Sequence, residues 1–412
     1  MYEIKPEVFT LSNGIRVVYL HAAAQVAHMG VTILCGSRFE DNNEVGLAHF
    51  LEHCIFKGTK NRKAFHVLSR LDSVGGEVNA YTTKEEICIY ASFTKNHFRR
   101  ASELLADITL NSSFPEKEIQ KEKEIIIDEI NSYLDSPSDK IFDDFESYLF
   151  KDHSLGNNIL GTKESVLSFT RENLLSYVDR FFTSGNMVIS FVGDISRKQL
   201  EKNLENDFKS CKTINVEPIK NDFSDAQPFK VWTKESNYQA HAVIGGIAPS
   251  YLDDHRRSTT LLTNILGGPA LNSRLNLTVR EKYGYSYTVE ANYSPFVDTG
   301  YWAVYFGTDP KYLKKSIDLV YKELKKLRDQ KMGILQLNAA KEQLKGHLAL
   351  GLDSNSGLML GLGKSLLLFD QIDTIPEIYK AIDKLSAEEL LETANLYFNE
   401  ENISELIFEI EN

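Results

Sequence analysis

The chain has 412 residues, which is enough for two or more domains that each bury a core of their own. Hydrophobic residues make up 42% and charged residues 25%, a balance typical of globular proteins in water. The 58 acidic residues outnumber the 46 basic ones, so the net charge is -12 at pH 7. This acidic balance argues against nucleic acid as the main partner, because phosphate contacts need a basic surface.

The sequence shows no signal for export or for a membrane span. Its start, "MYEIKPEVFTLSNGIRVVYL", lacks the basic residues and apolar run of a signal peptide. No stretch approaches the roughly 18 apolar residues that a spanning helix needs. The cysteines are scattered without a C-x-x-C pair, at Cys35, Cys54, Cys88 and Cys211. We therefore expect reduced thiols and a cytoplasmic location.

Strand and helix signals alternate along the first half of the chain. β-Branched runs bounded by Gly or Asn predict strands, and amphipathic runs predict helices. The expected elements are strands at 14–20 and 28–37, helices at 45–56 and 63–75, a hairpin of 76–83 and 85–93, helices at 96–110 and 114–137, and a buried strand at 186–195.

The second half repeats this order of elements. It predicts strands at 229–235 and 241–251, a helix at 253–268, a hairpin of 285–294 and 300–309, and helices at 312–329 and 335–354. The repeat predicts an α+β fold of two homologous domains, each a mostly antiparallel sheet packed with helices. We place these domains at 1–213 and 227–412, joined by a polar linker at 214–226.

The stretch "HFLEH", from His49 to His53, carries the chemistry of the first half. Residues four apart lie on one face of a helix, so the two histidines can bind one metal ion such as zinc. Glu52 precedes the second histidine, where a carboxylate can take a proton from metal-activated water. From spacing alone, an amphipathic helix with polar edge residues is an equally good interpretation.

Two histidines need a third protein ligand, and the long helix expected at 114–137 offers carboxylates. Glu122 and Glu129 lie seven residues apart, close to two turns, so they share a face beside an apolar stripe. Buried there, they need a partner or a metal; turned to water, they are ordinary surface charges. Helix geometry does not choose between Glu129 and its alternatives, Asp128 and Glu124.

Together these motifs resemble the pitrilysin/insulinase-type inverzincin (HxxEH) zinc metallopeptidases, especially bacterial members similar to mitochondrial processing peptidase. The resemblance covers essentially the whole chain, including "SNGIRVV", "GSRFED", "GLAHFLEH", "HSLGNNILGT" and "NMVISFVGD". It implies one zinc ion per chain, bound by His49, His53 and Glu129, with Glu122 close to the site. It also implies a zinc-dependent endopeptidase that hydrolyses peptides or unfolded polypeptide segments, with Glu52 as the general base.

The resemblance also implies where substrate binds. "GGEVNAYTTKEE" is similar to the family's substrate-binding edge strand, in which Asn79, Ala80 and Tyr81 would pair with an extended peptide. "VREKYGYSYTV" is similar to an Arg–Tyr element that binds substrate near the metal, here Arg280 and Tyr287. The alternatives are a plain hairpin strand, and a surface arginine beside a cross-strand aromatic ring.

The second domain is of an inactive type, because Thr259, Leu262 and Thr263 stand where the first domain has its motif. It is expected to complete the substrate site, with the two domains facing each other like a clam shell. Relatives of this length imply a homodimer or a heterodimer with an inactive homologue. Two other hypotheses remain for the function. The chain is a non-catalytic subunit of a peptidase complex, or it is a metal-dependent hydrolase of another substrate.

Overall fold

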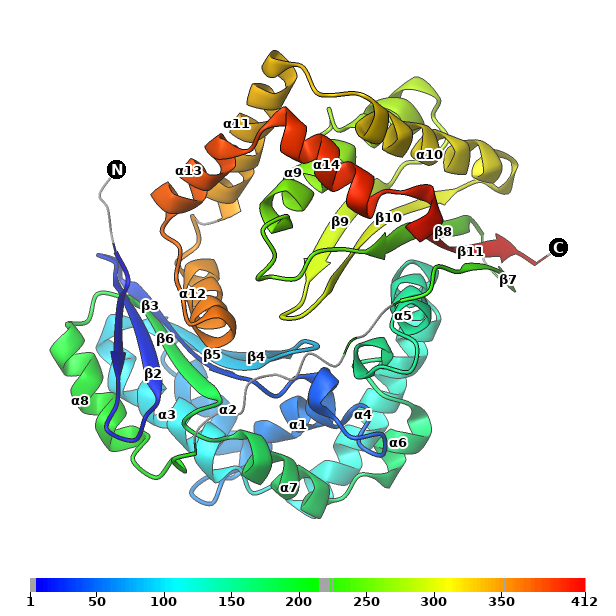
Figure 1. Ribbon diagram of the computed structural model, residues 1–412. Helices are drawn as coiled ribbons and strands as arrows, with labels where there is room; N and C mark the ends of the chain where they lie inside the picture. The colour runs from blue at the N-terminus through cyan, green and yellow to red at the C-terminus, as the bar shows by residue number, and fades with distance from the viewer. Residues whose placement is uncertain (1–4, 215–222, 224–225, 237, 352, 412) are drawn as a thin grey trace. The chain divides into compact units, whose positions relative to one another are not determined.

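The computed structural model describes residues 5–214, 223, 226–236, 238–351 and 353–411 (Figure 1). They form two compact units, and each combines segments that are distant in the sequence. The first unit comprises Met1–Asn131, Asn157–Pro218 and Leu350–Thr374, and the second comprises Ser132–Gly156, Ile219–Ala349 and Ile375–Asn412. Most of the linker expected at 214–226 lies outside the described residues, and the linear boundaries stay a prediction.

The first unit is built on a six-stranded mixed sheet with the order β1-β2-β6-β3-β5-β4. Among these strands, β2 and β6 are parallel and the other neighbours are antiparallel. In this strand order, β4 lies at one edge of the described sheet. The strands are β1 (Glu7–Thr10), β2 (Arg16–His21), β3 (Val26–Ile33), β4 (Glu77–Thr82), β5 (Ile87–Thr94) and β6 (Met187–Gly193).

Helices cover both faces of this sheet. Alternate residues of β3, such as Met29 and Val31, point into the main core with α1, α3 and α7. The opposite face is covered by α12, whose Met359 packs against Leu20 and Val192. The helices of this unit are α1 (Leu47–Ile55), α2 (Ala64–Asp72), α3 (Phe98–Asn111), α4 (Glu116–Leu134), α6 (Lys163–Ser168), α7 (Arg171–Phe181), α8 (Arg197–Asp207) and α12 (Asn355–Phe369).

The second unit has a five-stranded sheet with the order β7-β11-β8-β10-β9. Its parallel pair is β7–β11, which corresponds to β2–β6 in the first sheet. The strands are β7 (Lys230–Glu235), β8 (Ala240–Ile247), β9 (Val289–Pro295), β10 (Gly300–Thr308) and β11 (Ser404–Ile410). The matching strand order confirms the predicted repeat and the α+β class with mostly antiparallel sheets.

Helices also flank the second sheet. α5 (Pro137–Leu149) comes from the first half of the sequence, yet it packs on β8 and β11. The others are α9 (Arg256–Gly267), α10 (Leu313–Asp329), α11 (Ile334–Gly351), α13 (Ile375–Lys384) and α14 (Ala387–Tyr397). Within the described residues, no helix combines the length and the apolar character that crossing a bilayer requires.

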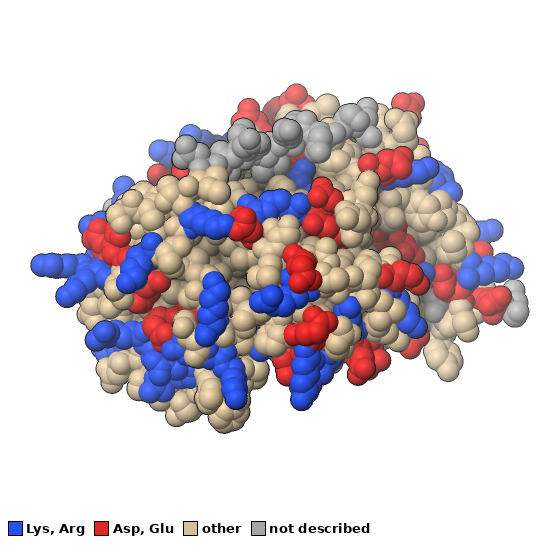
Figure 2. All heavy atoms as spheres, turned by 90° about the horizontal axis from the view of Figure 1, so that it is seen from below, with Lys and Arg blue, Asp and Glu red and all other residues tan. Residues whose placement is uncertain are grey.

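Charged side chains of both signs are intermingled over most of the face in Figure 2. Opposite charges within the first unit also form short ion pairs, such as Arg62 with Glu103 at 2.6 Å and Lys121 with Glu118 at 2.9 Å. The two charges of each such pair neutralise one another locally.

Candidate metal centre

Helix α1 places His49 and His53 one turn apart on the same face. Their ring centroids are 4.7 Å apart, and His49 is buried while His53 is half-buried. The opposite face of α1 is apolar and packs into the core of the first unit, through Leu47, Phe50, Leu51, Cys54 and Ile55. This apolar anchorage explains why the two imidazoles point to one side of the helix.

The start of α1 is fixed by a buried acidic side chain, Glu40. Glu40 accepts hydrogen bonds from the backbone N–H groups of Gly46, at 2.9 Å, and Ala48, at 2.7 Å. Burial raises the pKa of Glu40 to about 8, although both hydrogen bonds act in the opposite direction. Gly46 has a φ of 95°, and a Cβ there would lie 2.7 Å from Cα of Gly161. A side chain at this position would therefore displace the first turn of α1.

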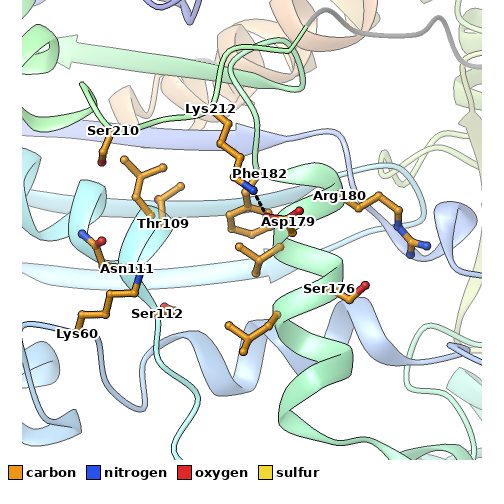
Figure 3. Close-up of a pocket in the computed structure, with 13 residues that line it drawn as sticks. Lys60, Thr109, Asn111, Ser112, Ser176, Asp179, Arg180, Phe182, Ser210 and Lys212 are labelled. Carbon is orange, nitrogen blue, oxygen red and sulfur yellow. Dashed lines mark hydrogen bonds and ion pairs between the residues drawn. The ribbon is translucent and has the colours of Figure 1, made fainter.

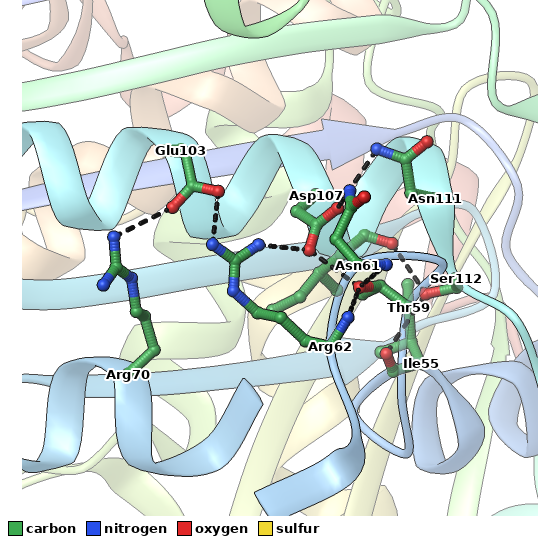
Figure 4. A network of polar contacts seen from close by, with 10 residues as sticks. Ile55, Thr59, Asn61, Arg62, Arg70, Glu103, Asp107, Asn111 and Ser112 are labelled. Atoms are coloured by element: carbon green, nitrogen blue, oxygen red, sulfur yellow. Dashed lines mark hydrogen bonds and ion pairs between the residues drawn. The ribbon is translucent and has the colours of Figure 1, made fainter. Parts of the chain in front are cut away.

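The end of α1 is held by the polar network in Figure 4. Ser112 Oγ donates to the carbonyl oxygen of Ile55 at 3.2 Å. Asp107, on α3, ties down the loop that leaves α1 by accepting hydrogen bonds from Thr59, Asn61 and Arg62 at 2.7, 2.6 and 2.5 Å. Both ends of α1 are thus attached to the body of the first unit.

Helix α4 brings Glu129 to the two histidines. Its carboxylate oxygens lie 3.4 Å from Nε2 of His53 and 3.8 Å from Nε2 of His49. One ligand atom from each of the three side chains lies within 4.8 Å of the others, and the described residues contain no other such group. The alternatives from helix spacing, Asp128 and Glu124, are not part of it.

Glu122, two turns before Glu129 on α4, contacts the other nitrogen of His53. Its Oε2 lies 3.3 Å from Nδ1 of His53, and its Oε1 lies 2.8 Å from Nζ of Lys57. Burial alone would lower the pKa of His53, but the hydrogen bond and the nearby carboxylates outweigh it and raise that pKa. Nδ1 of His53 is therefore occupied by its contact with Glu122, and Nε2 faces Glu129.

Lys57 was not anticipated from the sequence. It follows His53 by four residues, just past the end of α1, and this spacing is the signal that would have found it. Burial alone would raise the pKa of Glu122, yet its hydrogen bonds to His53 and Lys57 lower it. Glu122 is thus held as a charged group between the two.

The burial and protonation of His49 suit a metal ligand. Its Nδ1 is buried and has no hydrogen-bond partner among the described residues. Burial, with a smaller contribution from His53, lowers the pKa of His49 to about 4. The imidazole is therefore neutral at pH 7, and a neutral imidazole is the form that binds metals. Two imidazole nitrogens and one carboxylate fit the donor set of a zinc site with an open fourth position.

Glu52 is half-buried beside His53, on the same helix. Its Oε2 accepts a hydrogen bond from Thr82 Oγ1 at 2.7 Å. Burial raises the pKa of Glu52, while the hydrogen bond from Thr82 partly offsets this effect. Thr82 is the last residue of β4 and was not anticipated from the sequence.

The residues expected to bind substrate in the first unit lie on β4, at the edge of the sheet. The N–H of Ala80 donates to Oδ1 of its neighbour Asn79 at 2.9 Å. Tyr81 points to the face of the sheet opposite that of Ala80. There the centre of its ring lies 6.2 Å from that of Tyr90. An extended chain that paired with β4 would replace Asn79 Oδ1 as the partner of Ala80.

The expected Arg–Tyr element lies in the second unit. Arg280 belongs to the π-helix η4 (Asn276–Lys282), and its guanidinium carbon lies 4.7 Å from the centre of the Tyr287 ring. The Tyr287 side chain is 81% exposed. On α9, Thr259 and Thr263 are buried, and Thr263 Oγ1 donates to the Thr259 carbonyl oxygen at 3.0 Å. The Thr263 hydroxyl is thus satisfied within α9, whereas the Thr259 hydroxyl has no hydrogen-bond partner among the described residues.

A cavity of about 720 Å³ lies elsewhere in the first unit, between α3 and α7 (Figure 3). Polar and charged groups line it together with apolar ones, and Lys212 on its wall is paired with Asp179. Neither the His49–His53–Glu129 group nor Glu52 contributes to its lining. This cavity is therefore separate from the candidate metal centre.

Comparison with known proteins identifies two family regions in the chain. Residues 16–163 match the family described as "Insulinase (Peptidase family M16)", and residues 168–344 match "Peptidase M16 inactive domain". The first match contains His49, Glu52, His53 and Glu129.

Curated relatives match over nearly the full length. The chain is 33% identical to "Uncharacterized zinc protease YmxG" of Bacillus subtilis (strain 168), over 97% of both chains. It is 31% identical to "Uncharacterized zinc protease" of Rickettsia felis (strain ATCC VR-1525 / URRWXCal2), over 96% of both chains.

Solved structures share the fold. A crystal structure described as a peptidase M16 inactive domain from Pseudomonas fluorescens has a TM-score of 0.93 at 17% identity, covering 99% of this chain and 98% of that one. A protease from Helicobacter pylori has a TM-score of 0.90 at 20% identity, covering 98% of this chain and 100% of the other. The full-length relatives and the two family regions show that this chain belongs to peptidase family M16, the insulinase family.

Proposed function

We propose that the protein is a zinc-dependent endopeptidase that hydrolyses peptides or unfolded polypeptide segments. The observation that carries this proposal is the convergence of His49, His53 and Glu129, with Glu52 beside them. A carboxylate that is not one of the three ligands, next to an open metal position, is the arrangement that metal-assisted hydrolysis needs. The zinc proteases among the relatives support the same reaction class.

The contacts of each side chain support the following roles. His49, His53 and Glu129 would hold one zinc ion, and that ion would supply the Lewis acidity for activating water and polarising a peptide carbonyl. Glu52 accepts the proton of the attacking water and passes it to the leaving amine. Oε2 of Glu52 accepts a hydrogen bond from Thr82, which helps to orient the carboxylate. Glu122 keeps His53 oriented through Nδ1.

Substrate would bind as an added strand on β4, pairing with the backbone of Asn79, Ala80 and Tyr81. Such pairing requires an extended chain, which favours peptides and unfolded segments over folded proteins. In the second unit, Arg280 offers hydrogen-bond donors for a peptide carbonyl or carboxylate, and Tyr287 offers a hydroxyl. A homodimer, or a heterodimer with an inactive homologue, stays a prediction.

Peptide hydrolysis by the purified chain tests the proposal. We expect a chelator to abolish cleavage of a mixed peptide library and added zinc to restore it. Glu52→Gln should remove turnover while zinc remains bound, because the amide keeps the shape of the side chain but cannot accept the proton. Glu124→Gln, an exposed position on α4, is the matched control and should cleave like the wild type.

Two outcomes would contradict the proposal. Full activity of Glu52→Gln would exclude Glu52 as the base. A chain that binds zinc and peptide but never cleaves would instead be a non-catalytic subunit of a peptidase complex.

A further inference from the structure

Glu52 is in contact with a residue that has no assigned role. Thr82 Oγ1 donates to Glu52 Oε2 at 2.7 Å, a short hydrogen bond to a carboxylate. The two residues come from different elements, 30 positions apart, so the contact is created by the tertiary structure.

The direction of the Thr82 side chain is set by the sheet. Successive side chains of a strand point to opposite faces, so Val78, Ala80 and Thr82 share one face of β4. Val78 and Ala80 pack into the same core as the apolar residues of α1. Tyr81 points the other way, toward Tyr90 on β5. The hydroxyl of Thr82 is therefore presented to α1 by the packing of the strand itself.

This contact restrains the last torsion of the Glu52 side chain. Rotation about the last bond of a glutamate is broad, so an unanchored carboxylate exchanges its two oxygens freely. A donor on Oε2 fixes the carboxylate plane and thereby fixes the direction of Oε1. The half-buried position of Glu52 limits the water that could replace this donor.

We propose that Thr82 is a positioning residue that orients the Glu52 carboxylate for proton transfer. This inference rests on the proposed function, since it gives Glu52 the role of base. It adds a link between binding and chemistry, because Thr82 lies on the same edge strand that would pair with the peptide. The same strand would then bind the peptide through Ala80 and orient the base Glu52 through Thr82, two residues further along β4.

Steady-state kinetics of Thr82→Val and Thr82→Ser test the inference. Valine keeps the shape of threonine but lacks the hydroxyl, whereas serine keeps the hydroxyl. We expect kcat of Thr82→Val to fall about 10- to 100-fold, as for a misplaced catalytic group, with KM unchanged. Thr82→Ser should retain most of the wild-type kcat. Thr10→Val, an exposed position on β1, is the matched control and should leave both constants unchanged.

Crystal structures and zinc content give readouts that do not depend on turnover. In Thr82→Val the Glu52 carboxylate should be rotated or disordered, while zinc content equals that of the wild type. In Thr82→Ser it should occupy the wild-type position. Equal kcat in Thr82→Val and the wild type, or equal losses in both Thr82 variants, would overturn the inference.

The two proposals fail in distinguishable ways. An inactive wild type refutes the proposed function, whatever Thr82 does. In that case the position of Glu52 in the two variant crystals decides whether Thr82 orients the carboxylate, and an unmoved carboxylate in Thr82→Val rejects it.

Discussion

The two ring nitrogens of His53 face different carboxylates. Nδ1 contacts Glu122 at 3.3 Å, and Nε2 contacts Glu129 at 3.4 Å. A hydrogen bond on one nitrogen fixes the tautomer and leaves the other nitrogen for a metal. Lys57 adds a positive charge on the far side of Glu122, at 2.8 Å. The result is a chain of contacts, Lys57–Glu122–His53, that orients the candidate ligand.

Removing the charge of Glu122 should therefore weaken metal binding. In Glu122→Gln the amide still reaches His53 but loses the charge and the ion pair with Lys57. We expect zinc affinity to fall about 10- to 100-fold, the usual effect of losing a partner behind a histidine ligand. Competition with a chromophoric chelator measures this change.

Glu124→Gln on the same helix provides the control, since Glu124 is exposed. Unchanged affinity in Glu122→Gln would show that His53 needs no carboxylate behind it. A parallel fall in both variants would point to the overall charge of α4 instead.

At the scale of elements, α12 shows how closely a helix can approach the face of a sheet. Gly363 is buried against β3 and β6, and a Cβ there would lie 2.8 Å from Thr32 Oγ1 and 2.9 Å from Ser190 Oγ. Gly361, two residues earlier, is exposed and has nothing within 4 Å of its Cβ position. The small residue is thus needed at one of these positions and not at the other.

This pair of glycines makes a matched test. Gly363→Ala should destabilise the protein by about 1–3 kcal/mol, the usual cost of overpacking. Gly361→Ala should stabilise it by up to about 1 kcal/mol, because alanine favours the helix over glycine. Urea unfolding monitored by circular dichroism measures both changes. Equal effects of the two substitutions would mean that α12 does not pack closely on β3 and β6.

At the scale of the whole molecule, each compact unit includes a helix that comes from the other half of the sequence. α12 comes late in the sequence but covers the first sheet, as the orange helix in Figure 1 shows. α5 comes early but packs on β8 and β11 of the second sheet. Neither half of the linear sequence therefore contains all the parts of one compact unit.

A fragment of residues 1–213 should consequently fail to fold as a cooperative unit. It lacks α12, so Leu20 and Val192 lose their cover, and its α5 lacks the sheet on which it packs. We expect broad, weakly cooperative unfolding and binding of a hydrophobic dye. Co-expression with residues 214–412 should restore a folded complex. A fragment that unfolds as sharply as the intact chain would contradict this prediction.

Local patterns in the sequence predicted much of this architecture. The β-branched runs, the amphipathic helices and their repeat predicted the α+β class and most elements of both sheets. The helix α12 was not predicted, because its segment is apolar on almost every side and shows no 3.6-residue period. The strand β11 was not predicted either, because its partners β7 and β8 lie far away in the sequence.

The sequence by itself determined that His49 and His53 share a face, because helix geometry fixes residues four apart. It also placed Glu122 and Glu129 on one face of a second helix. Helix geometry could not choose Glu129 over Asp128 or Glu124, since that choice depends on how α4 lies against α1. Only the tertiary structure brought Lys57 to Glu122 and Thr82 to Glu52, because these contacts depend on side-chain placement and on packing between elements that no local period encodes.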